Sequence, residues 1–239
     1  MRTAVARNLP AQIISTLGSQ IVSGKIPAGS ILTADSLELQ FSVSRTVVRE
    51  ALKVLHDKRL TRARTKIGTI VLGRNEWNLL DPDVIHWLND SGLVPELVKD
   101  LEEVRSSYEP GVARIAAKRR GTKDINALTA AMKRMTDAFH EDGPDSPIIG
   151  EADSEFHQAL LDATQNELMK QMGLLFIPLL KIRDEMVRHV ISNGDFLTTH
   201  QATLDAIIDE DADAAEIAMR ALLEEATRSS NTFRKKARK

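Results

Sequence analysis

The segment VSRTVVREALKVLHDKRL, residues 43–60, decides the fold of the first third of the chain. Apolar residues recur at positions 48, 51, 52 and 55, which is the spacing of a helix with one buried face. Ser44 is a good N-cap residue and marks the expected start of this helix. Arg45, Arg49 and Lys53 repeat every four residues, so another face of the same helix is basic. The segment therefore predicts a helix that packs on a core and presents cations to solvent.

Two further helices are expected before this segment. Residues 9–24 carry apolar residues at helical spacing, with Pro10 near the expected start and Gly24 just past the end. Residues 26–32, IPAGSIL, are typical of a Pro/Gly turn, and residues 34–41 predict a short second helix. The segment at 43–60 then supplies the third helix of the group.

A basic hairpin is expected after the third helix. Residues 60–63 and 69–72 have the composition of two short strands, and the turn between them contains Lys66 and Gly68. Three helices followed by a basic hairpin predict a winged helix-turn-helix over residues 1–74.

The rest of the chain predicts helices and no strand. Residues 75–93 are expected to be a connector with a short helix, residues 94–232 an antiparallel bundle of six to seven helices, and residues 233–239 a basic tail. The chain is therefore expected to be mainly α. The helices expected in the bundle span residues 94–119, 123–140, 149–164, 167–190, 196–209 and 213–229.

The composition restricts the chemistry that this chain can perform. The sequence contains no cysteine, which excludes disulfides, thiolate zinc sites and thiol nucleophiles. The N-terminal residues lack a signal-peptide pattern, and no apolar stretch approaches about 18 residues. We therefore expect a soluble, cytoplasmic protein without a membrane partner.

Charge is distributed unevenly along the chain. Residues 1–74 contain 12 Lys and Arg against 4 Asp and Glu, whereas residues 75–239 contain 20 against 30. A basic small domain joined to an acidic larger one suggests that the first domain contacts a polyanion, although a chance split is the alternative. Arg45 and Arg49 have the donors for guanine edges or phosphates, and Thr46 could contact a base methyl group. Such a basic stripe is otherwise a solvated face.

Residues 10–72 closely resemble the N-terminal domain of GntR-type transcription regulators. The resemblance rests on residues 43–60, on the preceding G-x-I-P-x-G and on the following RTKIGTIV. Val47 replaces the proline usual in the family. Asp35 or Ser36 stands where many relatives carry an arginine, so that one contact is not expected here. The resemblance implies contacts to double-stranded operator DNA by Ser44, Arg45, Thr46, Arg49, Lys66 and Gly68.

A pair of possible metal ligands lies in the expected helix at 149–164. Asp153 and His157 are four residues apart, so they share one helix face and could ligate one ion. His200, on a later helix, is a candidate third ligand. The alternative is that Asp153 and His157 form an ordinary ion pair on the helix surface.

Residues 94–230 resemble the all-helical, FCD-type ligand-binding domain of the FadR branch of the same family. The matching features are EVRSSYEPGVARIAAKR, the D-x-x-F-H motif, and a histidine before an A-I-x-x-x-D-x-x-A-A run. The resemblance implies a divalent ion, such as Zn, Ni or Mn, held by one Asp and three His. Asp153, His157 and His200 match three of these positions. Leu222 stands at the fourth and cannot ligate a metal.

Two arginines are candidates for binding the effector. Arg105 matches a position that faces the effector pocket in relatives, where a guanidinium could hold a carboxylate by two hydrogen bonds. Its alternative is an ion pair with Glu109 or Glu102. Arg228 is the second candidate for this pocket.

Together these features predict a homodimeric repressor that binds a palindromic operator and responds to a small organic acid. The segment from Asn75 to Trp87 resembles the connector of galactonate-like sugar-acid regulators, which suggests an aldonate; otherwise Trp77 and Trp87 only hold the two domains together. One alternative is a DNA-binding dimer whose helical domain only dimerises. Another is a metal-dependent hydrolase, although no motif supplies a general base, and we do not expect an enzyme.

Overall fold

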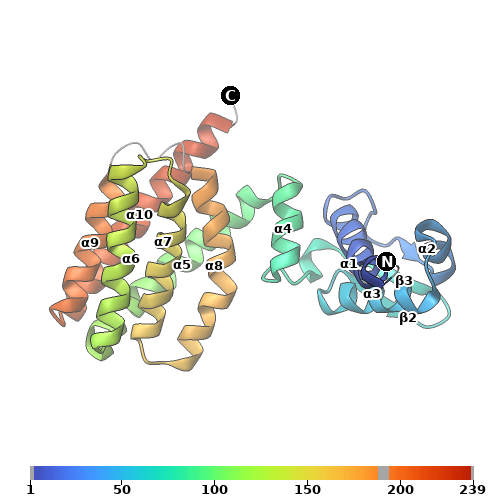
Figure 1. Ribbon diagram of the computed structural model, residues 1–239, viewed down its shortest axis with the longest axis horizontal. Coiled ribbons are helices and arrows are strands. Elements are labelled where there is room, and N and C mark those ends of the chain that lie inside the picture. Colours follow the sequence, from blue (N-terminus) through green and yellow to red (C-terminus); the bar gives the residue numbers. More distant parts are fainter. Residues whose placement is uncertain (1–2, 188–193, 238–239) are drawn as a thin grey trace. The chain divides into compact units, whose positions relative to one another are not determined.

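The computed structural model describes residues 3–187 and 194–237, and the chain divides into two compact units, Met1–Val94 and Pro95–Lys239. Figure 1 labels the elements of both units. The first unit contains four helices and a small sheet, and the second is helical throughout its described part. No helix among the described residues combines the length and apolar character needed to cross a membrane.

The first unit contains the predicted winged helix-turn-helix. Its helices α1 (Thr3–Val22), α2 (Ala34–Phe41) and α3 (Arg45–Asp57) pack around side chains such as Leu17 and Leu55, which are fully buried. Helix α1 begins upstream of the position expected from the sequence. Pro10, which suggested a helix start, lies inside α1, because a proline removes one helical hydrogen bond without necessarily ending the helix.

The wing is a sheet of three antiparallel strands in the order β1-β3-β2. Strands β2 (Thr61–Arg64) and β3 (Gly68–Val71) form the expected hairpin. Strand β1 (Ile31–Leu32) was not predicted, since residues 26–32 were interpreted only as a turn. Ile31 lies opposite Ile70 of β3. Two residues are too few to show the alternation by which a strand is recognised in a sequence.

The segment expected to be a connector contributes structure to the first unit. It contains the 3-10 helix η1 (Arg74–Glu76) and helix α4 (Pro82–Asp90), which packs on α1. Trp87 of α4 is 4% exposed, and a Cβ atom built on Gly18 of α1 would lie only 2.3 Å from its ring. The glycine therefore allows the indole to lie directly against the α1 backbone.

An ion-pair cluster joins α4 to the end of α3. The Lys58 Nζ atom lies 2.9 Å from Asp81 Oδ1 and 2.7 Å from Asp83 Oδ2. Burial lowers the pKa of Lys58, but the two carboxylates outweigh that effect and raise its pKa above the usual value. The start of α4 is thus held to the helix that was predicted to read DNA.

The described residues of the second unit form six helices, as the helical spacing predicted. Neighbouring helices lie side by side in Figure 1, and Val112, Met135, Phe156 and Met219 are among their fully buried side chains. The helices are α5 (Val94–Arg119), α6 (Thr122–Glu141), α7 (Pro147–Ala163), α8 (Glu167–Val187), α9 (Asp195–Ile208) and α10 (Ala212–Ala237).

One helix end differs from the sequence prediction, whereas the last residues of the helix expected at 167–190 lie outside the described residues. Helix α10 continues well past residue 229 into the basic tail. Arg234 of this tail donates a hydrogen bond to Glu102 Oε2 at 2.8 Å, and its side chain is only 21% exposed. The basic tail is therefore anchored to α5 at least at this residue.

Candidate functional site

The N-terminal turn of α3 presents the predicted DNA contacts on the surface of the first unit. Ser44 occupies the N-cap position, but its hydroxyl accepts no capping hydrogen bond from the helix. The first backbone N–H groups of α3 therefore lack that side-chain acceptor, an arrangement that suits a phosphate. Thr46 and Arg49 are exposed, whereas Val48, on the opposite face, is fully buried.

The two arginines of α3 differ in their surroundings. Arg45 Nη1 lies 2.7 Å from Asp35 Oδ1 on α2, and more than half of the Arg45 side chain is exposed. Asp35 is one of the two positions at which the family resemblance implies an arginine. In this chain its carboxylate pairs with Arg45 instead of supplying a cation. Arg49 forms no ion pair with any residue that the structure describes. Arg49 therefore needs to break no ion pair to contact DNA.

The wing carries a second group of predicted contacts. Lys66 is exposed at the turn, with a backbone φ of 64°. Gly68 has a φ of 125°, and a Cβ atom there would lie 2.9 Å from the Leu32 carbonyl oxygen. The pairing of β1 with β3 thus explains this glycine without DNA. Arg64, opposite Gly68 in the hairpin, is also exposed; the alternating Arg62-Ala63-Arg64 pattern could have identified it.

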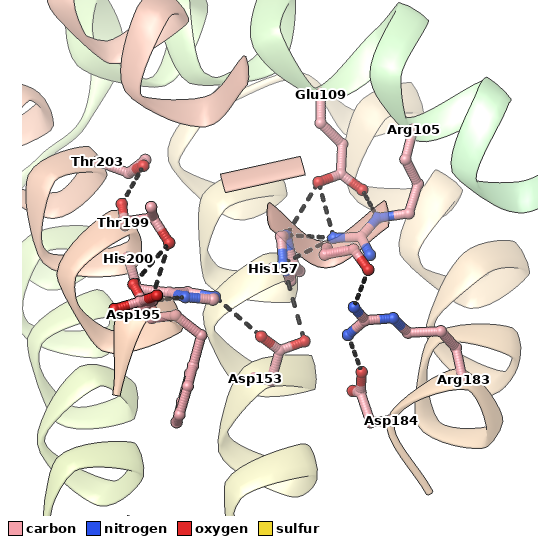
Figure 2. A network of polar contacts seen from close by, with 12 residues as sticks. Arg105, Glu109, Asp153, His157, Arg183, Asp184, Asp195, Thr199, His200 and Thr203 are labelled. Carbon is pink, nitrogen blue, oxygen red and sulfur yellow. Dashed lines mark hydrogen bonds and ion pairs between the residues drawn. The ribbon is translucent and has the colours of Figure 1, made fainter. Parts of the chain in front are cut away.

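The second unit brings the three candidate metal ligands together (Figure 2). Asp153 and His157 lie on α7 and His200 on α9, and one ligand atom from each falls within 4.8 Å of the other two. His200 Nε2 is 2.8 Å from Asp153 Oδ1, and His157 Nε2 is 3.8 Å from Asp153 Oδ2. All three residues are more than 90% buried.

Hydrogen bonding fixes the orientation of His200. Its Nδ1 lies 2.8 Å from the Phe196 carbonyl oxygen, which can only accept, so Nδ1 donates a proton to that contact. A neutral His200 then turns the Nε2 lone pair towards the Asp153 carboxylate. Two acceptors at 2.8 Å need a cation, either a proton or a metal ion.

His157 is held between two charged residues of α5. Its Nδ1 lies 3.0 Å from Glu109 Oε2, and its Nε2 lies 2.8 Å from Arg105 Nη2. Arg105 Nε in turn donates to Glu109 Oε1 at 2.5 Å. The ion pair of Arg105 with Glu109, one of the alternatives for Arg105, is therefore formed, while Glu102 pairs with Arg234. Arg105 and a metal ion would use the same nitrogen of His157.

These contacts displace the pKa values of the buried carboxylates. Burial alone raises the pKa of a carboxyl group, but Arg105 and His157 outweigh it and lower the pKa of Glu109 to about 2. In the same way the charges of His157 and His200 overcome burial and hold the pKa of Asp153 well below its usual range. Asp153 is thus an ionised carboxylate in the interior of the bundle.

The three candidate ligands line a cavity of about 210 Å³. Leu222 lines the same cavity and is 2% exposed, so an apolar side chain occupies the position of the fourth ligand in relatives. Among the described residues, five acidic and three basic side chains contribute to the lining. They are Glu151, Asp153, Asp184, Glu185, Glu225, Arg105, Lys181 and Arg183.

Of the two arginines predicted to bind effector, the structure places only Arg105 at this cavity. Arg228 is exposed and is not among the described residues that line the cavity, so its role in effector binding stays a prediction. Leu222 and Ala226 face the cavity, and residue 228 lies about 200° around α10 from Ala226. Sequence reasoning instead missed Arg183 and Asp184 of α8, because that segment was analysed only for its apolar spacing.

The residues present fit a divalent cation. Asp153 Oδ2 is buried and has no hydrogen-bond partner among the described residues, and the 2.8 Å contact of His200 Nε2 with Asp153 Oδ1 needs a proton or a metal ion between the two atoms. A carboxylate oxygen and two imidazole nitrogens are suitable ligands for Zn, Ni or Mn. The site offers three protein ligands and opens on a cavity, which leaves coordination positions for water or a ligand.

The two units match two protein-family models. Residues 9–71 match the model described as "Bacterial regulatory proteins, gntR family", and residues 100–225 match the FCD domain. The first match covers the helix-turn-helix and the wing, and the second covers the helices that carry the cavity.

Individual relatives extend over nearly the whole chain. The galactonate operon transcriptional repressor of Escherichia coli K12 is 34% identical over 224 residues, which is 92% of this chain and 96% of that protein. The Uxu operon transcriptional regulator of the same organism is 29% identical and covers 74% of this chain and 68% of its own. A solved structure, Streptococcus agalactiae GntR, has a TM-score of 0.51 at 22% identity, covers 92% of this chain and 99% of its own, and supports the fold alone.

Proposed function

Because the chain belongs to the gntR family of bacterial regulatory proteins and carries an FCD domain, we propose that it is a repressor controlled by a small organic acid bound in its helical unit. Membership in this family makes it a DNA-binding transcription regulator, and not the hydrolase considered from its metal-ligand residues alone. We also propose that it acts in the cytoplasm.

The observation that carries the proposal is the buried cavity around Asp153, His157 and His200. Its lining contains more carboxylates than cations, and Arg105 is already paired with Glu109. An anionic effector would therefore meet net negative charge in a site partly shielded from water, which is costly unless a cation is added. We propose that the three ligands hold a divalent ion for this purpose.

The ion and the residues around it would then have separate roles in binding the effector. The bound ion supplies the positive charge that a carboxylate and an adjacent hydroxyl group of the effector share. Glu109 holds Arg105 through both Nε and Nη2, so Nη1 would be the nitrogen that donates to the effector. The carbonyl oxygen of Phe196 keeps His200 oriented by accepting a hydrogen bond from Nδ1.

For DNA binding we propose a homodimer that places two copies of α3 about 34 Å apart on a palindromic operator. Arg49 and Thr46 would contact base edges or phosphates from α3. Arg45 would leave its ion pair with Asp35 and pair with the DNA, and the N-terminal end of α3 at Ser44 would bind a phosphate. Lys66 and Gly68 at the wing would contact the neighbouring backbone. Effector binding would weaken operator binding, and by linkage the DNA complex would bind the effector more weakly.

The first class of effector to test is the aldonates. The relative that is 34% identical over nearly the whole chain is a galactonate operon repressor. The cavity of about 210 Å³ is smaller than typical sites for drug-sized ligands, about 300–1,000 Å³, and suits a small acid.

Thermal melting of the full-length protein tests the proposal. The protein is freed of metal with a chelator, reloaded with Zn²⁺, Ni²⁺ or Mn²⁺, and melted with D-galactonate, D-gluconate, L-lactate or citrate. An acid at one hundred times its Kd is expected to stabilise the protein by about 2.7 kcal/mol, and the chelator is expected to abolish this effect.

Two histidine variants provide the comparison. His157→Ala should lose both the bound ion and the response to acid. His86→Ala should retain both, because His86 lies on the exposed surface of α4, where its one ion pair among the described residues is with Asp90. An acid response that survives in His157→Ala would refute the ligand assignment. The absence of any acid response in the metal-loaded wild type would favour a helical unit that only dimerises.

A further inference from the structure

Helix α8 places two buried charged residues at the cavity. The proposed metal site uses neither of them. Arg183 is 6% exposed and Asp184 is 9% exposed, and both line the cavity. Arg183 Nη1 donates to Asp184 Oδ1 at 2.7 Å, and Arg183 Nη2 donates to the Ala226 carbonyl oxygen at 2.8 Å. The two side chains thus form a hydrogen-bonded pair anchored to α10.

This pair has one donor and one acceptor left over. Arg183 Nε and Asp184 Oδ2 are buried and have no hydrogen-bond partner among the described residues. Buried polar groups are nearly always hydrogen-bonded, and a buried donor or acceptor without a hydrogen bond lowers stability. Both remaining atoms belong to residues of the cavity wall, so a molecule in the cavity is a natural partner for them.

The chemistry of the pair selects the kind of partner. Because Arg183 already donates from Nη1 to Asp184 and from Nη2 to the Ala226 carbonyl oxygen, it does not offer a second carboxylate the two parallel donors of a free arginine. A wall that offers both a donor and an acceptor complements hydroxyl groups, which both accept and donate. Hydroxyl groups of the ligand could therefore satisfy the two atoms.

The position of the pair relative to the metal ligands is also suitable. Figure 2 shows Arg183 and Asp184 on α8, facing Asp153 on α7. Gly150 of α7 permits this proximity, since a Cβ atom there would lie 3.1 Å from Asp184 Cβ. One ligand in the cavity can thus contact residues of both helices.

We propose that Arg183 and Asp184 form a second subsite, which binds a hydroxyl group on the effector beyond the carbon next to its carboxylate. This inference rests on the proposed function, in which the carboxylate end lies at the ion and Arg105. An acid with a single hydroxyl next to its carboxylate occupies only the metal end. A polyhydroxy acid reaches both ends, so the subsite selects polyhydroxy acids over short hydroxy acids.

The test compares the Kd values of D-galactonate and L-lactate for the full-length, Zn²⁺-loaded protein by isothermal titration calorimetry. Asp184→Leu keeps a side chain of similar size and removes both oxygens. It should weaken galactonate binding at least tenfold, while the Kd values of lactate and Zn²⁺ change less than threefold. Asp184→Asn, which still donates and accepts, should keep the wild-type preference for galactonate to within about threefold.

Two further variants make the result independent of a folding defect at one position. Arg183→Met removes the Nε donor and should reduce the preference for galactonate as Asp184→Leu does. The control Asp137→Leu, on the outer face of α6 where Asp137 pairs with Lys133, should leave both acids unaffected.

The outcomes separate this inference from the proposed function. If the wild type binds neither acid, the proposed function fails and the subsite with it. If the wild type binds both acids and Asp184→Leu weakens them equally or not at all, the subsite alone is refuted. Loss of galactonate binding with lactate and Zn²⁺ retained would establish it.

Discussion

Replacing Gly18 by alanine is expected to destabilise the DNA-binding unit. The new Cβ atom would lie 2.3, 2.4 and 2.6 Å from three carbons of the Trp87 ring. Carbon atoms pack best at about 3.5–4.0 Å, so each of these contacts is strongly repulsive. Trp87 is 4% exposed and has no room to turn away without disturbing α4.

The magnitude follows from two opposing terms. Overpacking of a filled core costs about 1–3 kcal/mol, whereas alanine in place of glycine inside a helix gains about 0.5–1 kcal/mol. The upper limit is the loss of the whole indole contact, about 4–6 kcal/mol for 150–250 Å² of buried surface. We expect a net loss of about 1–2 kcal/mol in the free energy of unfolding.

Tryptophan fluorescence during urea unfolding measures this loss in the full-length protein. The chain has two tryptophans, Trp77 and Trp87, and both lie in the first unit, so the signal reports on that unit alone. Gly111→Ala is the matched control, because Gly111 is also inside a helix and a Cβ atom there meets nothing within 4 Å. It should leave the fluorescence transition unchanged and stabilise the helical unit, measured by circular dichroism, by about 0.5–1 kcal/mol. A Gly18→Ala protein with an unchanged or higher urea midpoint would refute the packing of α4 on α1.

Three other perturbations test separate parts of the account. Leu222→His should supply a fourth ligand and tighten Zn²⁺ binding at least tenfold, about 1.4 kcal/mol, in competition with a chelator; unchanged affinity would place Leu222 away from the ion. Arg49→Ala should cost about 1–3 kcal/mol at the operator without changing the melting temperature, and undiminished binding would remove Arg49 from the interface. Burial and the charge of Asp153 raise the pKa of Asp184 to about 8 in the folded protein. The folded state therefore binds the extra proton, and the free energy of unfolding of metal-free protein should fall as pH rises from about 4 to about 8. Asp184→Asn should flatten this slope in denaturant titrations, and an unaltered slope would assign it to other groups.

The architecture could be predicted because its signals are local. The buried positions of α3 repeat at helical spacing, and the helices of the second unit are long enough for the same pattern to be clear. Strand β1 could not be found in this way, since Ile31 and Leu32 become a strand only by pairing with β3. The contact of Gly18 with Trp87 was also hidden, because nothing near either residue in the sequence indicates the other.

The candidate site was predictable to the extent that its residues lie on one helix. Asp153 and His157 are four positions apart, so their proximity follows from helix geometry. His200 was assigned through a family resemblance, and only the packing of the bundle brings it to Asp153. Arg183 and Asp184 are adjacent residues of opposite charge type in a mostly apolar helix, a pattern that gives no local sign of a cavity. Arg228 was assigned without knowing which face of α10 turns inward.

The most direct test of the central claim is whether an acid bound in the helical unit changes the affinity for DNA. The operator is first selected from random duplexes with the metal-loaded, full-length protein, and its binding is then followed by fluorescence anisotropy while D-galactonate is added. The account predicts that the acid releases the DNA, and that chelation or His157→Ala abolishes release without abolishing DNA binding. Unchanged operator affinity in a protein shown by calorimetry to be saturated with the acid would contradict it.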